Sequence, residues 1–320
     1  MSPLFKRRHE DETLTLYYAS DIHGSELLWR KFLGASKFYG ADAAIMGGDL
    51  LGKAVVPIEQ RADGRYTLTF LGAERVIGEE ELATTESSIR FNGFYPWVAP
   101  ADEIARHRAD QEALFHEVAR RELQGWIDLA DERANGHRPF VIAGNDDPWY
   151  VDELLATARG IVFCDDRVTR VGPHEMISLS YANPTPWASP RELGEDELYE
   201  RLRTLSDQLE QPATAIFNLH VPPFDSGLDR APKLKPDLTP VYAGGQPVPI
   251  PVGSTAVRRL IEEVQPLLAL HGHIHESRGE TRIGRTLALN SGSEYNTGRL
   301  HGVVVRLGVD RVISHQFVVG

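Results

Sequence analysis

The sequence predicts a layered α/β fold, and three observations support that prediction. Short apolar runs with the pattern of buried β-strands alternate with helical segments along much of the chain. Several of these runs are followed directly by Asp, Asn or His. From about residue 281, short alternating runs separated by glycine indicate antiparallel strands.

The first elements are expected in the order strand, helix, strand. A β-rich run over residues 13–19 precedes a helix over 25–38, whose apolar residues fall on one face, and a second strand over 41–46. Further buried strands are predicted over residues 139–143, 213–219 and 267–270. Runs over 281–283, 285–289, 302–307 and 311–318 are expected to be antiparallel strands that complete a sheet.

Three insertions are expected to interrupt and cap a single domain that spans residues 1–320. The first, about 52–136, holds a hairpin pattern (55–60 and 66–71), an acidic helix start near 79–86, an aromatic loop over 91–97 and a long helix from about 102 to 133. The second, 181–210, begins as a loop and ends in a helix from Glu195. The third, 222–253, is rich in proline and glycine and is expected to be an extended loop.

The polar residues after the predicted strands form an ordered set of oxygen and nitrogen donors. A single Asp after a strand is more often a turn or capping residue than a ligand, so each position alone indicates little. As a set they suit hard and borderline divalent metals, and they gather where an α/β sheet places its ligands. The motifs are Asp21-Ile22-His23, Gly47-Gly48-Asp49, Gly144-Asn145-Asp146, His220 and Gly272-His273-Ile274-His275.

The order and spacing of these motifs, followed by Asn290-Ser291-Gly292-Ser293, resembles the calcineurin-like metallophosphoesterase superfamily and, within it, an uncharacterised prokaryotic branch. The resemblance implies a sandwich of two mixed β-sheets flanked by helices, with the insertions capping the site. It implies a first metal held by Asp21, His23, Asp49 and His275, and a second held by Asp49, Asn145, His220 and His273. Two divalent ions are expected, with manganese preferred over iron, zinc, nickel or cobalt.

This resemblance implies a metal-dependent phosphoric ester hydrolase in which a metal-bridging hydroxide attacks phosphorus in line. Many family members have a His after the Asn ligand, but this chain has Asp146 there. An aspartate beside two cations is ionised and is a poor acid, so the leaving group has to be protonated by His271, His220 or water, or leave unaided. Asp146 and His271 are the candidate catalytic residues, and activated or diester substrates are expected to be preferred.

The composition narrows the class of substrate and the cellular compartment that we expect. A net charge of −12 disfavours a broad nucleic-acid surface, so a small phosphodiester or phosphomonoester is expected ahead of DNA or RNA. A nuclease and a non-catalytic metal-binding scaffold remain as alternatives. The single cysteine, Cys164, and the absence of a signal-like or bilayer-spanning apolar run favour the cytoplasm and no membrane partner. Oligomeric state stays open.

Overall fold

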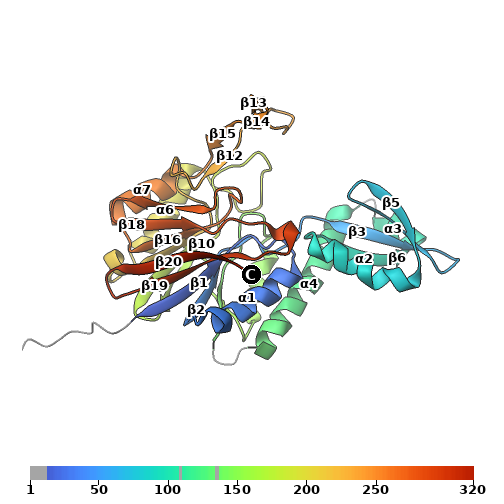
Figure 1. The fold of residues 1–320 in the computed structure, drawn as a ribbon, viewed down its shortest axis with the longest axis horizontal. Helices are drawn as coiled ribbons and strands as arrows, with labels where there is room; N and C mark the ends of the chain where they lie inside the picture. The colour runs from blue at the N-terminus through green and yellow to red at the C-terminus, as the bar shows by residue number, and fades with distance from the viewer. Residues whose placement is uncertain (1–12, 108–109, 134–136) are drawn as a thin grey trace, which may run out of the picture.

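Two six-stranded sheets form the core of the computed structural model, which describes residues 13–107, 110–133 and 137–320 (Figure 1). The first sheet has the order β20-β19-β1-β2-β7-β8. Its strands are β1 (Leu14–Ala19), β2 (Ala43–Met46), β7 (Phe140–Val141), β8 (Val162–Phe163), β19 (His301–Leu307) and β20 (Val312–Val319). The second has the order β17-β18-β16-β11-β10-β9. Its strands are β9 (Arg167–Val171), β10 (His174–Leu179), β11 (Ile216–Leu219), β16 (Leu268–His271), β17 (Gly279–Ile283) and β18 (Thr286–Asn290).

Helices cover the outer face of each sheet. Residues of α1 (Glu26–Tyr39), α4 (Gln111–Arg133) and α5 (Tyr150–Thr157) share one apolar core with β1 and β2, whereas α6 (Glu195–Ser206) and α7 (Thr255–Val264) pack on the second sheet. Two short 3-10 turns complete the helical elements, η1 (Pro212–Thr214) and η2 (Tyr295–Thr297). The helix predicted over 25–38 is confirmed as α1, and Ser25 caps its amino end.

Alternation along β1 explains how the layers assemble. Leu16 and Tyr18 point into the core between the sheets, where they join residues such as Ile216. Tyr17 points to the other face and packs against Phe32 of α1. Because successive side chains of a strand face opposite sides, a run that is apolar throughout belongs to a sheet covered on both faces.

Parallel pairing brings the important strand ends to one edge. The strands β1, β2 and β7 are mutually parallel neighbours in the first sheet, and β11 runs parallel to β16 in the second. Their carboxyl ends therefore open into loops on the same side of the sandwich, where α/β sheets hold their ligands.

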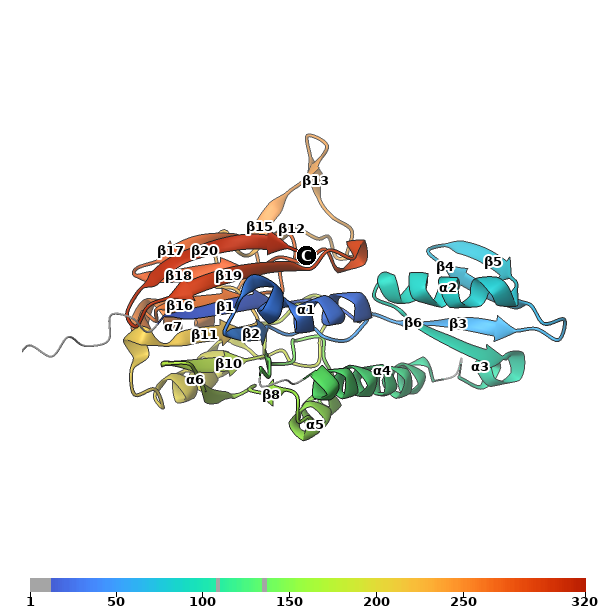
Figure 2. The same ribbon diagram turned by 60° about the horizontal axis from the view of Figure 1, so that its bottom comes forward.

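The first insertion folds into a small sheet of its own. Its strands β3 (Val55–Gln60), β4 (Tyr66–Phe70), β5 (Ala73–Ile77) and β6 (Tyr95–Pro100) have the order β5-β4-β3-β6, and α2 (Glu79–Phe91) and α3 (Ala101–His107) accompany them. Figures 1 and 2 show this unit beside the core, near the amino-terminal end of α4. The predicted hairpin is confirmed as β3 and β4, and the acidic helix start as α2.

Two predictions for this insertion were wrong. The aromatic segment 91–97 is not all loop, because Tyr95 and Trp97 alternate inward along β6 and are buried against the layer of α4. The long helix is divided into α3 and α4. Asp110 accepts a hydrogen bond from the backbone N–H of Ala113 (2.9 Å), so it begins a new helix there.

The other insertions and the chain end also differ in part from expectation. The helix from Glu195 is confirmed as α6. The third insertion forms two small ladders, β12 (Arg230–Pro232) with β15 (Pro249–Pro251) and β13 (Tyr242–Ala243) with β14 (Gln246–Pro247), in an arm that projects from the core (Figure 1). The last strands complete both sheets rather than one, and β18 pairs parallel to β16.

No helix in the described ranges has both the length and the apolar composition that a bilayer crossing requires. Residues 1–12, where no signal-like run was expected, and residue 136, the expected end of the first insertion, lie outside the described residues. The division into one domain with three insertions stays a prediction.

Candidate metal centre

The loops after five strands bring the predicted ligands together. Asp21, His23, Asp49 and His275 each offer a ligand atom, and these atoms lie within 4.8 Å of one another. Asp49, His220 and His273 form a second group on the same criterion. The two groups share Asp49, so together they form one centre with two adjoining halves.

Asp49 lies between the two halves, with a different carboxylate oxygen near each. Its Oδ2 is 3.5 Å from Nε2 of His23, and its Oδ1 is 3.5 Å from Nε2 of His220. On the second side, Oδ1 of Asn145 lies 3.0 Å from Nε2 of His220. On the first side, Nε2 of His23 and Nε2 of His275 are 3.0 Å apart. All seven predicted ligands are therefore gathered at one place.

Glycines allow the loops to approach this closely. A Cβ added to Gly144 would lie 2.1 Å from Oδ1 of Asp49, and one added to Gly272 would lie 2.3 Å from Oδ2 of Asp21. Both distances are far below a van der Waals contact, so only glycine fits at these positions. The close approach of the loops thus explains why these motifs have glycine beside their polar residues.

Hydrogen bonds between the ligand side chains and the backbone orient the ligands. Nδ1 of His220 donates to the carbonyl oxygen of Gly47 (2.8 Å), which leaves Nε2 directed at the centre. The backbone N–H of His273 donates to the Asp21 carboxylate (3.0 Å), and that of Asp146 donates to Oδ1 of Asp49 (3.1 Å). These contacts orient the carboxylates of Asp21 and Asp49.

The ionisation of Asp21, His23 and His273 suits cation binding. Burial would raise the pKa of Asp21, but contact with His275 outweighs it and holds the pKa to about 2. Burial lowers the pKa of His273 to about 4 and lowers that of His23, so both rings are neutral with free lone pairs. For His220 and His275, burial is outweighed by Asp49 and by Asp21, respectively, which raise the pKa of each ring, so a bound cation would take the place of a proton there.

This donor set fits divalent cations. Two carboxylates that are at most 3% exposed hold negative charge away from water, and the ionisable groups beside them are imidazole nitrogens at 3.4–3.5 Å. Oxygen and neutral imidazole donors without thiolate are the ligands of magnesium, manganese, iron, nickel or zinc rather than of soft metals.

Asp146 lies at the rim of the centre, and both of its carboxylate oxygens accept hydrogen bonds. Its Oδ2 accepts a hydrogen bond from Nζ of Lys53 (2.5 Å), and its Oδ1 accepts from Oγ of Ser189 (2.7 Å) and from Nδ2 of Asn145 (3.1 Å). The carboxylate is therefore paired with the ammonium group of Lys53. Its catalytic role stays a prediction.

His271 lies deeper, at the last position of β16. The ring is fully buried, and its Nδ1 donates to the carbonyl oxygens of Leu219 (2.8 Å) and Val221 (3.1 Å). It belongs to neither Asp/His group. The ring thus braces the loop that carries His220, and its role as an acid stays a prediction without support from this position.

Sequence reasoning missed three residues around the centre. Lys53 and Ser189 contact Asp146, as described above. Asp147 is fully buried and accepts hydrogen bonds from the backbone N–H groups of Leu50, Leu51 and Gly144 (2.8–2.9 Å), so it ties two ligand loops together. A second acidic residue directly after Asn145-Asp146 was the one available signal for this role.

The Asn290-Ser291-Gly292-Ser293 motif, which begins at the last residue of β18, supports the ligand loops. Nδ2 of Asn290 donates to the carbonyl oxygens of Gly272 (3.2 Å) and Ile274 (3.0 Å). Oγ of Ser293 donates to the carbonyl oxygen of Asp21 (2.6 Å). These bonds hold the loop after β16 against the loop after β1.

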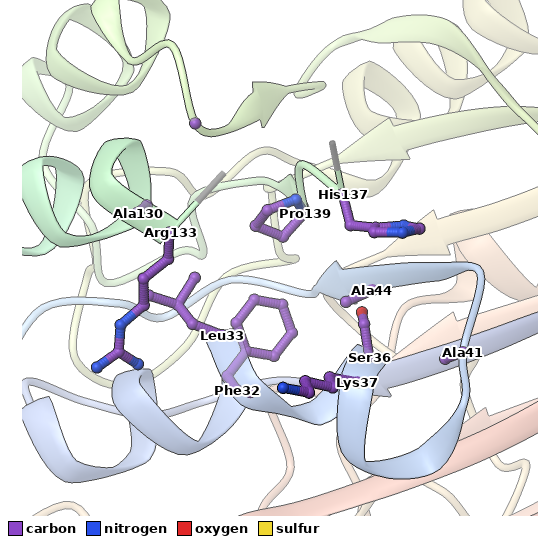
Figure 3. A pocket seen from close by; sticks show the side chains of 12 residues that line it. Phe32, Leu33, Ser36, Lys37, Ala41, Ala44, Ala130, Arg133, His137 and Pro139 are labelled. Atoms are coloured by element: carbon purple, nitrogen blue, oxygen red, sulfur yellow. The ribbon is translucent and has the colours of Figure 1, made fainter. Parts of the chain in front are cut away.

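A separate cavity of about 390 Å³ lies elsewhere, between α1 and the end of α4 (Figure 3). Phe32, Leu33 and Pro139 line its apolar part, and Lys37 and Arg133 stand at its edge. It contains none of the predicted ligands, so the cavity is distinct from the centre.

Comparison with known proteins places the fold. No protein-family model matches the chain. The crystal structure of TT1561 from Thermus thermophilus has a TM-score of 0.53 at 14% identity, covering 93% of this chain and 100% of that one. That likeness and the two facing mixed sheets confirm the metallophosphoesterase-type sandwich, and at this identity they establish the fold alone.

Two further matches give less information about the fold. The uncharacterized protein MJ1162 of Methanocaldococcus jannaschii is 29% identical over 155 residues, which are 47% of this chain and 62% of that protein. The chain therefore spans less than two thirds of that relative. The sulfate thiohydrolase SoxB of Thermus thermophilus is 14% identical over 95% of this chain and 56% of its own, and its TM-score of 0.37 is too low to support an argument.

Proposed function

We propose that this chain is a hydrolase of small phosphoesters that uses two divalent metal ions. The observation that carries the proposal is the position of Asp49, which presents one carboxylate oxygen to each of two groups of Asp and His side chains. A shared carboxylate of this kind is the usual bridge of a two-metal hydrolytic site.

The residues divide between the two ions as the resemblance implied. Asp21, His23 and His275 would hold the first ion, Asn145, His220 and His273 the second, and Asp49 both. When bound, such ions lower the pKa of a water molecule and neutralise charge on the phosphoryl oxygens. We take manganese as the first candidate, because the donors are carboxylate, amide and imidazole groups.

The chain's own residues set the direction of substrate approach and limit proton transfer. Asp21, His23, Asp49 and His220 are closed off from solvent, whereas His275 and Asp146 keep about a third of their side-chain surface exposed (28% and 34%). The substrate therefore approaches from the side of His275 and Asp146. Because both carboxylate oxygens of Asp146 already accept hydrogen bonds, we do not assign Asp146 as the acid for the leaving group. Esters with good leaving groups are the expected substrates.

We place the enzyme in the cytoplasm as part of the same proposal. Cys164 is a buried free thiol, and a chain with one cysteine forms no internal disulfide. The net charge of −12 supports a small substrate in preference to nucleic acid.

Turnover of metal-stripped protein after addition of Mn²⁺, Zn²⁺, Ni²⁺ or Mg²⁺ tests the proposal. The substrates are p-nitrophenyl phosphate, bis(p-nitrophenyl) phosphate and single-stranded DNA, and bound metal is measured in parallel. We expect metal-dependent turnover of the small esters, with a loss of at least about a hundredfold in Asp49→Asn because a shared ligand is gone. Asp310→Asn, which alters an exposed carboxylate, is the matched control.

Each other outcome selects an alternative. Two bound ions without turnover of any substrate would favour a metal-binding scaffold. Faster cleavage of DNA than of the small esters would favour a nuclease. Absence of bound metal would contradict the ligand assignment itself.

A further inference from the structure

Lys53 stands at the open side of the metal centre and belongs to no motif described from the sequence. It follows Asp49 by four residues, and its Nζ lies 2.5 Å from Oδ2 of Asp146. Burial opposes its charge, but Asp49 and Asp146 outweigh burial and raise the pKa of Lys53.

Two insertions hold this lysine in position. The backbone N–H of Gly52 donates to the hydroxyl of Tyr95 (2.8 Å), and that of Lys53 donates to the carbonyl oxygen of Gly93 (3.1 Å), both in the first insertion. From the second insertion, Ser189 donates to the carboxylate of Asp146, the partner of Lys53. These bonds hold the backbone at Lys53 and the carboxylate that its ammonium group contacts.

Lys53 is nevertheless accessible to a ligand. Its side chain is 37% exposed, and the residue also borders a hollow of about 670 Å³ whose other walls include Trp97 and Phe115. Within the described ranges its ammonium group has one partner at hydrogen-bond distance, Asp146, whereas an ammonium group has three donors. Donors remain for an anion that enters from the open side.

We propose that Lys53 binds a non-bridging phosphoryl oxygen of the substrate and so favours phosphomonoesters, which carry more charge than diesters. The inference rests on the proposed function for its substrate and on geometry for its residue. A phosphomonoester carries about −1.5 to −2 charges at neutral pH, whereas a diester carries one. A fixed cation beside the metal centre stabilises the more highly charged ester more strongly.

Phosphate binding to the metal-loaded protein, measured by calorimetry, tests the proposal without relying on turnover. Lys53→Met keeps the length of the side chain and removes the charge, Lys53→Arg restores a cation, and Lys235→Met alters an exposed lysine of the arm. We expect Lys53→Met to weaken phosphate binding about tenfold or more, as for loss of a charged hydrogen bond, with unchanged metal content. Lys53→Arg should recover most of the affinity, and Lys235→Met should match the wild type.

Turnover of p-nitrophenyl phosphate and bis(p-nitrophenyl) phosphate adds the second arm. Lys53→Met should lower kcat/KM for the monoester at least about threefold more than for the diester. Phosphate affinity within about twofold of wild type, or equal losses on both esters, would overturn the inference. So would loss of bound metal in Lys53→Met, since Lys53 would then maintain the centre itself. If the wild type cleaves neither ester yet binds phosphate through Lys53, the proposed function and the ester preference both fail, and only the assignment of Lys53 as a phosphate-binding residue stands.

Discussion

At the scale of single residues, four of the ligand positions have a left-handed backbone. The φ angles of Asp21, His23, Asp49 and His273 are 58°, 37°, 52° and 64°. Such conformations cost about 1–3 kcal/mol each and persist where surrounding contacts impose them. The backbone N–H of Asp21 donates to the carbonyl oxygen of Gly48 (2.9 Å), and that of His23 donates to that of Asp49 (3.0 Å). Contacts between these two loops thus impose the left-handed conformations on Asp21, His23 and Asp49.

The close contact between Gly144 and Asp49 leads to a prediction about a single residue. In Gly144→Ala the new Cβ would lie 2.1 Å from Oδ1 and 2.3 Å from the backbone N of Asp49, so the carboxylate has to move. We expect bound metal to fall and kcat/KM to drop by at least about a hundredfold, because a shift of about 1 Å is costly in a catalytic site. Metal analysis and ester turnover measure this.

Gly125→Ala is the matched control. Gly125 is exposed within α4, and a Cβ there meets nothing within 4 Å. Alanine should therefore raise the free energy of unfolding by about 0.5–1 kcal/mol and leave turnover unchanged. Normal metal content in Gly144→Ala would contradict the close approach of the two loops.

At the scale of elements, the ends of the core strands were predictable from the sequence. The boundaries of the helices between them were less predictable. The apolar runs before Asp21, Asp49 and His220 locate β1, β2 and β11, because strands covered on both faces need continuous apolar sequence. The ligands follow from parallel pairing of those strands. The break between α3 and α4 was missed, because local composition favours helix throughout and Asp110 acts as a cap only in context.

Lys53 and Ser189 show why part of the site could not be predicted. They lie 136 positions apart in the sequence (189 − 53), in separate insertions, and meet only at Asp146. Neither has a periodic or motif signal, so their roles depend on how the insertions pack on the core. The left-handed backbone at Asp21 and Asp49 is likewise imposed by tertiary contacts rather than by residue type.

His174, the first residue of β10, gives a pH-dependent prediction at this scale. Its ring is buried, and Nδ1 donates to the carbonyl oxygen of Thr214 (2.8 Å). Burial lowers the pKa of His174 from its ordinary value of 6.5, with that hydrogen bond opposing. The unfolded chain therefore takes up the proton first as pH falls. The stabilising contribution is complete above pH 6.5 and is lost progressively as pH falls through the folded-state pKa.

His174→Asn tests this, because Asn can keep the donor to Thr214 and does not titrate. Urea unfolding of both proteins with metal present should show a free-energy difference that shifts in favour of the variant between about pH 7 and pH 5. A difference that stays constant over this interval would show that His174 does not titrate on unfolding.

At the scale of the whole molecule, the candidate metal centre takes its residues from both sheets. Asp21, Asp49 and Asn145 follow strands of the first sheet, whereas His220 and His273 follow strands of the second. Apolar packing between the sheets holds the sandwich together along most of its length. At the site edge, by contrast, polar loops meet, and buried carboxylates oppose that contact unless a cation offsets their charge.

Metal removal should therefore lower the stability of the entire sandwich. Each ion that binds only the folded chain adds about 2.7 kcal/mol to the free energy of unfolding at a hundredfold excess over its Kd. We expect wild-type protein with excess Mn²⁺ to unfold at higher urea than chelated protein, in one transition, because the ligands couple both sheets. In Asp49→Asn, which lacks the shared ligand, the same comparison should give a much smaller shift. Superimposable curves for loaded and chelated wild type would contradict the centre's role in joining the sheets, and two separate transitions would show that the sheets unfold independently.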